Sequence, residues 1–197
     1  MLSEVVMRWY GAGCGGIAAM VLAGGLAVAD EDMAARTEAA RGVVKLFATE
    51  LTGRLKQAME VGGPTEAIAV CHTEAPVIAA GLSESSGWDI GRTSLRLRNP
   101  DNAPDAWEVA VLEEFAARKA QGEDVAKLER TEIVEADGAR TFRYMKAIPT
   151  AEMCTACHGT ALAPEVAASL AELYPQDQAT GFAVGDLRGA FTLRQPL

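Results

Sequence analysis

The segment KLERTEIVEADGARTFRYMKAIP, residues 127–149, decides the fold class. Asp137 and Gly138 form a two-residue turn signal between two strand-like stretches, residues 131–136 and 140–148. An Asp-Gly pair favours the tight turn whose twist matches the two strands of a hairpin. We therefore predict an antiparallel β-hairpin over this segment.

We expect helices before this hairpin, and we expect further short helices and strands on both sides of it. Apolar residues recur at three- and four-residue steps between residues 32 and 60, which predicts a long amphipathic helix. Gly62-Gly63 ends that helix, and a second one starts at Pro64 and is kinked or ended near Pro76. Further expected elements are helices at 106–119 and 164–173, strands at 88–98 and 183–193, and a loop at 99–105. Helices followed by strands that alternate with helices indicate an α+β fold class, in a single domain.

The hairpin leads into C-T-A-C-H at residues 154–158. In an exported chain this pentapeptide indicates covalent haem attachment, with thioethers at Cys154 and Cys157 and with His158 as the proximal iron ligand. The two intervening residues allow one helical turn to present both sulfurs to the same edge of the porphyrin. The same cysteine spacing occurs in zinc sites and in thiol redox proteins, so the pentapeptide alone leaves these alternatives open.

Residues 1–29 have the pattern of a cleavable signal peptide, with Arg8 before an apolar run and an A-x-A cleavage site at Ala27-Val28-Ala29. An uncleaved membrane anchor is the alternative. We expect export to the periplasm, a haem-binding domain over residues 30–197, and no membrane insertion after cleavage. The net charge of −9 argues against binding to nucleic acid or anionic lipid.

Export makes the cysteine count informative. Without the signal peptide the chain keeps Cys71, Cys154 and Cys157, an odd number that a disulfide scaffold would avoid. The two histidines, His72 and His158, each follow a cysteine directly. This concentration of soft ligands at two places implies one metal site fed by two segments. A Cys3His zinc site built from the three cysteines and His158 also fits tetrahedral coordination, and it stays open as an alternative.

The residue on the distal side of a haem is left open between Cys71 and His72, because only one of two neighbouring helical side chains can point at the iron. Arg92, Arg96 and Arg98 form a basic cluster in an acidic protein. An arginine fork suits a haem propionate. A solvated strand face with surface ion pairs is the alternative for these three arginines.

Four blocks of sequence follow one another in a recognisable order. They are A-I-A-V-C-H-T-E-A-P-V-I-A at 67–79, G-R-T-S-L-R-L-R-N-P-D-N-A-P-D-A-W-E at 91–108, C-T-A-C-H-G at 154–159 and Y-P-Q-D-Q-A-T-G-F-A-V-G-D-L-R-G-A-F at 174–191. Together they resemble the c-type haem-binding PAS-like family, which includes free-standing cytochromes and extracytoplasmic haem sensor domains. The resemblance implies a PAS-like antiparallel sheet with N-terminal helices packed against it. It also implies His/Cys axial ligation, with Cys71 as the distal ligand and His72 as its rival.

The sequence therefore predicts a periplasmic monohaem c-type cytochrome that transfers electrons at low potential and is not an enzyme. Thiolate donation stabilises ferric iron, and axial ligand identity is a principal determinant of the potential. The redox partner protein is not identified by the sequence. The first alternative is a haem-based sensor of redox state or of a diatomic gas, in which Cys71 leaves the reduced iron and a small gas ligand enters. The second alternative is the structural zinc protein.

Overall fold

The computed structural model describes residues 22–197, with side chains from residue 32 onward. The chain divides into two units, Met1–Arg36 and Thr37–Leu197. In the first unit, Arg36 Nε lies 2.9 Å from Asp32 Oδ2 within the opening part of a helix. The expected signal peptide at residues 1–29 falls mostly outside the described residues, and its cleavage stays a prediction. Within the described part of the chain, no helix is both long enough and apolar enough to cross a membrane.

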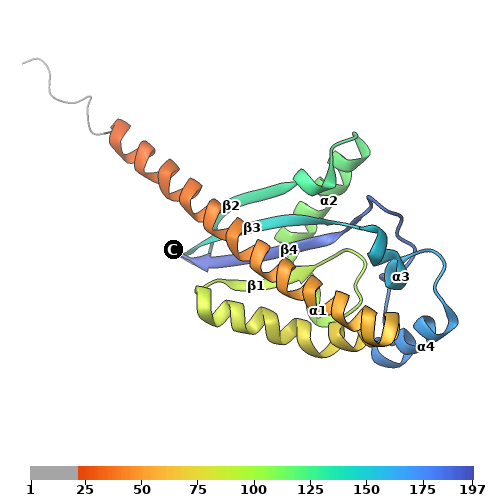
Figure 1. Ribbon diagram of the computed structural model, residues 1–197. Coiled ribbons are helices and arrows are strands. Elements are labelled where there is room, and N and C mark those ends of the chain that lie inside the picture. Colours follow the sequence, from red (N-terminus) through yellow and green to blue (C-terminus); the bar gives the residue numbers. More distant parts are fainter. Residues whose placement is uncertain (1–21) are drawn as a thin grey trace, which may run out of the picture. The chain divides into compact units, whose positions relative to one another are not determined.

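Helix α1 (Leu22–Ser86) turns back on itself at Gly63, where φ is 71° and ψ is −161°. A side chain would be strained at these angles, so the turn requires glycine. In the second unit, the first arm (residues 37–62) and the second arm (residues 64–86) lie side by side and antiparallel (Figure 1). Arg54 Nε of the first arm lies 3.5 Å from Glu74 Oε2 of the second. The predicted break between two helices at Gly62-Gly63 is confirmed.

The second arm does not end near Pro76, contrary to one of the two expectations for that position, but continues to Ser86. A proline removes a helical hydrogen bond and often ends a helix. Here Ala75 and Ile78 are buried on either side of it, so packing against the core offsets the loss. The continued helix brings Ser83 to the sheet, where its Oγ accepts a hydrogen bond from Ile90 N at 3.1 Å.

Four antiparallel strands form one sheet in the order β1-β4-β3-β2. Their bounds are β1 (Asp89–Thr93), β2 (Glu129–Ala136), β3 (Ala139–Pro149) and β4 (Leu187–Pro196). The predicted hairpin is β2–β3, and Asp137 and Gly138 form its turn with φ values of 52° and 78°. The antiparallel hairpin predicted over residues 127–149 is therefore confirmed.

Two predicted strands have different bounds in the structure, because β1 ends at Thr93 and β4 begins only at Leu187. The chain leaves the sheet after β1 at Ser94, whose Oγ donates to Arg188 O at 2.8 Å. The start of β4 is delayed by Asp186, whose Oδ2 accepts from Ala183 N at 2.7 Å and holds a turn. Both strand ends are therefore set by a hydrogen bond between a side chain and the backbone: Ser94 bonds to a distant strand, and Asp186 bonds within its own loop.

Helices cover both faces of the sheet. Helix α2 (Ala106–Ala120) packs on one face, where its buried side chains join those of β3 and β4: Val111, Leu112, Phe115, Met145, Ala147 and Ala190. The first arm of α1 covers the opposite face, where the Phe47 and Phe191 ring centroids lie 5.5 Å apart. Neighbouring residues of a strand point to opposite faces, so Ala190 and Phe191 mark the two layers. The predicted α+β class and the packing of N-terminal helices on an antiparallel sheet are confirmed.

Helix α4 (Pro164–Leu173) has the predicted bounds and packs beside the second arm of α1. Its Val166 and Leu170 contact Ile68 of that arm, and Tyr174 closes the same cluster. This cluster lies next to Cys157, which packs against it. The α4 cluster therefore joins the second arm to the segment that carries the cysteine motif.

Candidate functional site

The C-T-A-C-H segment forms one compact turn after β3. The 3-10 turn η3 (Glu152–Cys154) runs directly into the short helix α3 (Thr155–His158). Cys154 and Cys157 are therefore three residues apart on one helical turn, which places their side chains on the same side. Both thiols are free and half-buried. The near-helical presentation of two thiols expected from the spacing is confirmed.

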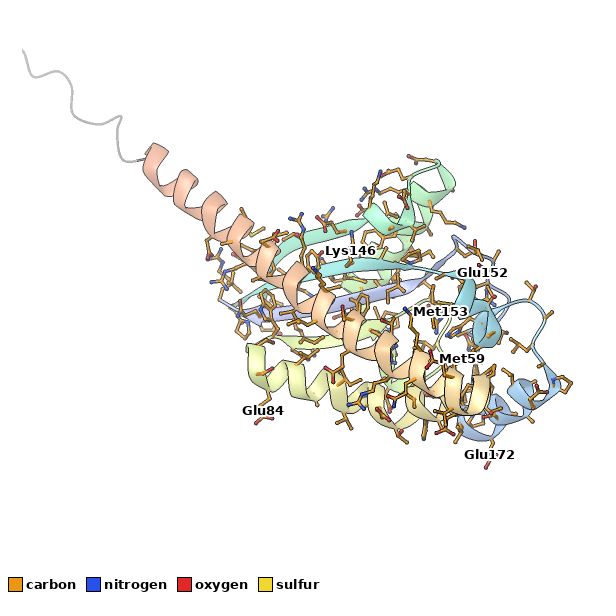
Figure 2. All side chains as sticks on the ribbon, viewed as in Figure 1. Met59, Glu84, Lys146, Glu152, Met153 and Glu172 are labelled. Carbon is orange, nitrogen blue, oxygen red and sulfur yellow. The ribbon has the colours of Figure 1, made fainter. Side chains whose placement is uncertain are left out.

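This attachment turn (residues 154–158) lies against the start of the second arm of α1. Cys157 Sγ is 3.8 Å from the carbonyl oxygen of Pro64. Figure 2 labels Glu152 and Met153, the two residues that directly precede Cys154 after the end of β3. The turn thus occupies the end of the sheet at which α1 reverses.

Two polar groups contact His158 Nδ1. Ala179 O lies 2.7 Å away and accepts from Nδ1 in the Nδ1–H tautomer, which leaves the lone pair on Nε2. Arg188 Nε lies 3.1 Å from the same atom and donates to it in the other tautomer. Burial, with the charges of Arg188 and Arg98, lowers the pKa of His158 to about 2, so the imidazole is neutral and suited to bind a metal.

Arg98 ties the attachment turn to a distant loop. Its Nη2 donates to Cys157 O at 2.5 Å and to Ala179 O at 3.2 Å, and it pairs with Asp177 Oδ2 at 3.1 Å. The side chains of Arg98 and Asp177 are each only 9% exposed. Arg98 therefore fixes both the peptide of Cys157 and the carbonyl that orients His158.

Cys71 lies on the second arm, within the electrostatic reach of three arginines that we define as the arginine cluster: Arg92, Arg98 and Arg188. Burial raises the pKa of the Cys71 thiol, and the charges of these three arginines oppose the rise. The same three guanidinium groups act on the pKa of His158. Cys71 and His158 therefore lie around one cluster, although 87 residues separate them in the sequence.

His72, the rival of Cys71, has a different environment. Its side chain is exposed, and its ring packs edge-on against Tyr174 with the centroids 5.2 Å apart. Neighbouring helical residues point about 100° apart, so only one of the pair can face the arginine cluster. The charges of the cluster act on the pKa of the Cys71 thiol.

The arginines predicted to contact propionates differ from one another. Arg96 is exposed, donates to Gln178 O at 3.1 Å and to Thr180 O, and lies 4.4 Å from the Phe182 ring centroid. Arg98 is buried and committed to backbone and Asp177, as described above. Arg92 is half-buried and stacks over the Phe47 ring at 5.6 Å.

Arg188 also belongs to the site, and no local pattern in the sequence predicts this. It lies at the start of β4, in the block at 174–191, and contacts His158 at 3.1 Å. A lone arginine in a strand pattern is typical of a solvated face. Its position beside His158 follows from the pairing of β4 between β1 and β3, which local sequence does not reveal.

The structure does not bring together the ligands of the alternative Cys3His zinc site within the described residues. Among the residues that the structure describes, no three His, Cys, Asp or Glu side chains gather as metal ligands. His158 Nε2 lies 3.5 Å from Arg98 Nη1, so this guanidinium would have to move before any metal, zinc or iron, binds to Nε2.

The fold and the site define a class: an α+β protein with helices on both faces of an antiparallel sheet, a C-x-x-C-H turn at the sheet end and a cysteine facing it from a helix. A family model described as Tll0287-like (Tll0287) matches residues 22–196, and the chain belongs to this family. The membership confirms the family resemblance indicated by the four sequence blocks.

One solved structure, titled "Crystal structure of the cyanobacterial heme-protein Tll0287", has a similar fold. Its TM-score is 0.59 at 24% sequence identity, over 84% of this chain and 95% of that chain. At this identity the match supports the fold. No curated protein sequence matches the chain.

Proposed function

We propose that this protein binds one haem covalently through Cys154 and Cys157, with His158 as the proximal ligand and Cys71 as the distal ligand. The observation that carries the proposal is that two free thiols and a neutral imidazole share one turn, around the same arginines as Cys71. The similar solved structure is titled a heme-protein, which supports the same cofactor.

The residues fit haem in their chemistry. Cys154 and Cys157 form no disulfide and lie on one helical turn, which suits two thioether bonds to one edge of the ring. In the tautomer in which Nδ1 donates to Ala179 O, the lone pair of His158 lies on Nε2, and it would bind the iron once Arg98 Nη1, 3.5 Å away, has moved. In metal-binding histidines, a hydrogen bond from the ring nitrogen that does not bind the metal fixes the tautomer and the orientation of the ring. When bound, haem supplies a one-electron iron couple.

We further propose that the protein transfers electrons at low potential in the periplasm. A cysteine ligand supports this function because thiolate donation stabilises ferric iron. The acidic surface charge suits a docking partner with a complementary basic patch, since opposite surface potentials steer association. Because the proposed function is electron transfer, we expect this partner to be another redox protein.

A redox titration tests the electron-transfer proposal. The purified protein is poised with mediators, and the Soret absorbance gives the midpoint potential. A value well below that of a His/Met cytochrome is expected for His/Cys ligation. A high positive potential would rule out the cysteine ligand.

Sensing is the second candidate function, and one feature of the structure favours it. Cys71 comes from α1, whereas both attachment cysteines and His158 come from the turn after β3. Loss of the Cys71 bond on reduction would therefore leave the attachment intact and open one coordination position. Carbon monoxide added to the reduced protein distinguishes the two functions. A Soret shift supports gas sensing, and an unchanged band supports simple electron transfer.

A further inference from the structure

The arginine cluster carries more positive charge than the protein around it neutralises. Arg92, Arg98 and Arg188 contribute three charges, and Asp177 is the one carboxylate of the described residues that forms an ion pair with any of them. The cluster therefore has a net charge of two, inside a chain of net charge −9. Burial and the neighbouring guanidinium groups lower the pKa of Arg188 to about 10. Burial also lowers the pKa of Arg92.

The three arginines differ in how many of their donors are used. Arg98 donates to two carbonyls and pairs with Asp177. Arg188 directs Nε at His158 Nδ1, 3.1 Å away, and donates one long hydrogen bond from Nη1 to Arg96 O at 3.4 Å, whereas its Nη2 donates to no residue that the structure describes. Arg92 forms no side-chain hydrogen bond with any residue that the structure describes, and only stacks on Phe47. Arg92 and Arg188 thus keep unused donors beside Cys71 and His158.

Unused guanidinium donors in a half-buried, positively charged place are suited to carboxylates. The planar fork of arginine binds a carboxylate through two parallel hydrogen bonds. Two carboxylates would balance the net charge of the cluster. Haem carries two carboxylates, its propionates, and the arginine cluster lies beside Cys71 and His158, the residues proposed to bind the iron.

We propose that Arg92 and Arg188, and not Arg96 or Arg98, bind the haem propionates. The inference rests on the proposed haem binding. The two arginines come from the neighbouring strands β1 and β4, so the sheet itself positions them. Arg98 serves as a structural tie for the attachment turn, and Arg96 is held at the surface by Gln178 O and Thr180 O.

The test compares R92Q and R188Q with R96Q as the matched control, all prepared as the covalently loaded protein. The propionate bending band in the resonance Raman spectrum and the pH dependence of the midpoint potential are measured. An opposite charge nearby lowers a carboxyl pKa by about 1 to 3 units, so each variant should raise a propionate pKa by roughly that amount. The band should shift in R92Q and R188Q, and R96Q should behave as the wild type.

R92K and R188K cover the case in which a glutamine variant fails to fold or to bind haem. They keep the charge but lose the two-pronged fork, so the propionate band should still shift while the pKa change is smaller. Wild-type band positions in both lysine variants and both glutamine variants would overturn the inference, as would a shift in R96Q alone. Wild-type protein without covalent haem would instead overturn the proposed function, so the two failures are distinguishable.

Discussion

Cys71 and His72 are neighbours in the chain with opposite surroundings. Cys71 faces the arginine cluster, and His72 is exposed beside Tyr174. We expect C71S to keep its covalent haem and to lose the thiolate spectrum of the ferric state. The midpoint potential should rise by more than about 59 mV, which is a tenfold change in the equilibrium of a one-electron couple. Ferric EPR and a redox titration measure both changes.

H72A is the matched control for this substitution. It changes the next residue of the same helix without touching the arginine cluster, so its EPR spectrum and potential should equal those of the wild type. The reverse pattern, with a changed spectrum in H72A and a wild-type spectrum in C71S, would assign the distal position to His72.

The buried ion pair between Arg98 and Asp177 should contribute to the stability of the fold. Removing one partner leaves an uncompensated buried charge, so R98A should lower the free energy of unfolding by about 3–5 kcal/mol. R54A is the control, because Arg54 and Glu74 form an exposed pair that should contribute less than about 1 kcal/mol. Urea unfolding measures both. Equal small losses in the two variants would show that Arg98 does not tie the turn to the loop.

At the scale of single residues, the sequence identifies what depends on local spacing. Cys154, Cys157 and His158 lie within one turn, so their relative placement follows from the motif. The choice between Cys71 and His72 depends on which side of the second arm faces the site, and that is a tertiary contact. The role of Arg98 and the presence of Arg188 depend on strand order, so no local pattern reveals them.

Among the elements, β1 and β4 approach each other closely at Gly189. A Cβ added there would lie 2.3 Å from Thr93 O, so the two strands would have to separate. We expect G189A to lower the free energy of unfolding by roughly 1–3 kcal/mol, as overpacked sites do. G53A is the control: it lies in α1 with open space around it and should gain about 1 kcal/mol from helix propensity. Thermal unfolding that shows the same sign for both variants would contradict this account of the sheet.

The contact between α1 and β2 makes stability depend on pH. The hydrogen bond from Arg41 lowers the pKa of Glu129, and Tyr144 Oη donates to the same carboxylate at 2.8 Å. A carboxyl with a lowered folded pKa stabilises the protein above its unfolded pKa, about 4.3 for Glu. This contribution is lost as the pH falls through the folded value. E129Q should therefore weaken the acid dependence of unfolding below about pH 4.

E38Q is the control for that acid dependence. Glu38 also pairs with Arg41, at 3.0 Å, but its side chain is 76% exposed. Urea unfolding at several pH values should give E38Q the wild-type slope. A wild-type slope in E129Q would show that the pair of Arg41 and Glu129 does not couple the helix to the sheet.

The sequence predicts the elements well where one local signal governs them. The Asp-Gly turn, the glycine break in α1 and helices α2 and α4 all follow from residues within a few positions. The ends of β1 and β4 do not, because Ser94 and Asp186 act through hydrogen bonds to a distant strand or a loop. Pro76 shows the same effect in a helix, where burial of Ala75 and Ile78 outweighs a local helix breaker.

In the whole molecule, α1 and the sheet bring together two sequence blocks that lie far apart. The second arm carries Cys71, and the end of β3 carries the attachment turn. The α+β class could be predicted from the element pattern. The strand order β1-β4-β3-β2 could not, because pairing between distant strands has no local signature.

Every functional prediction above depends on covalent binding of haem through the attachment turn. The most direct measurement is the visible spectrum of the protein after acid-acetone extraction, on chain produced with a c-type haem maturation system. We predict that the haem absorbance stays with the wild-type protein and moves to the extract in a variant with both Cys154 and Cys157 replaced by alanine. Haem in the extract of the wild type, or no haem absorbance before extraction, would contradict covalent binding.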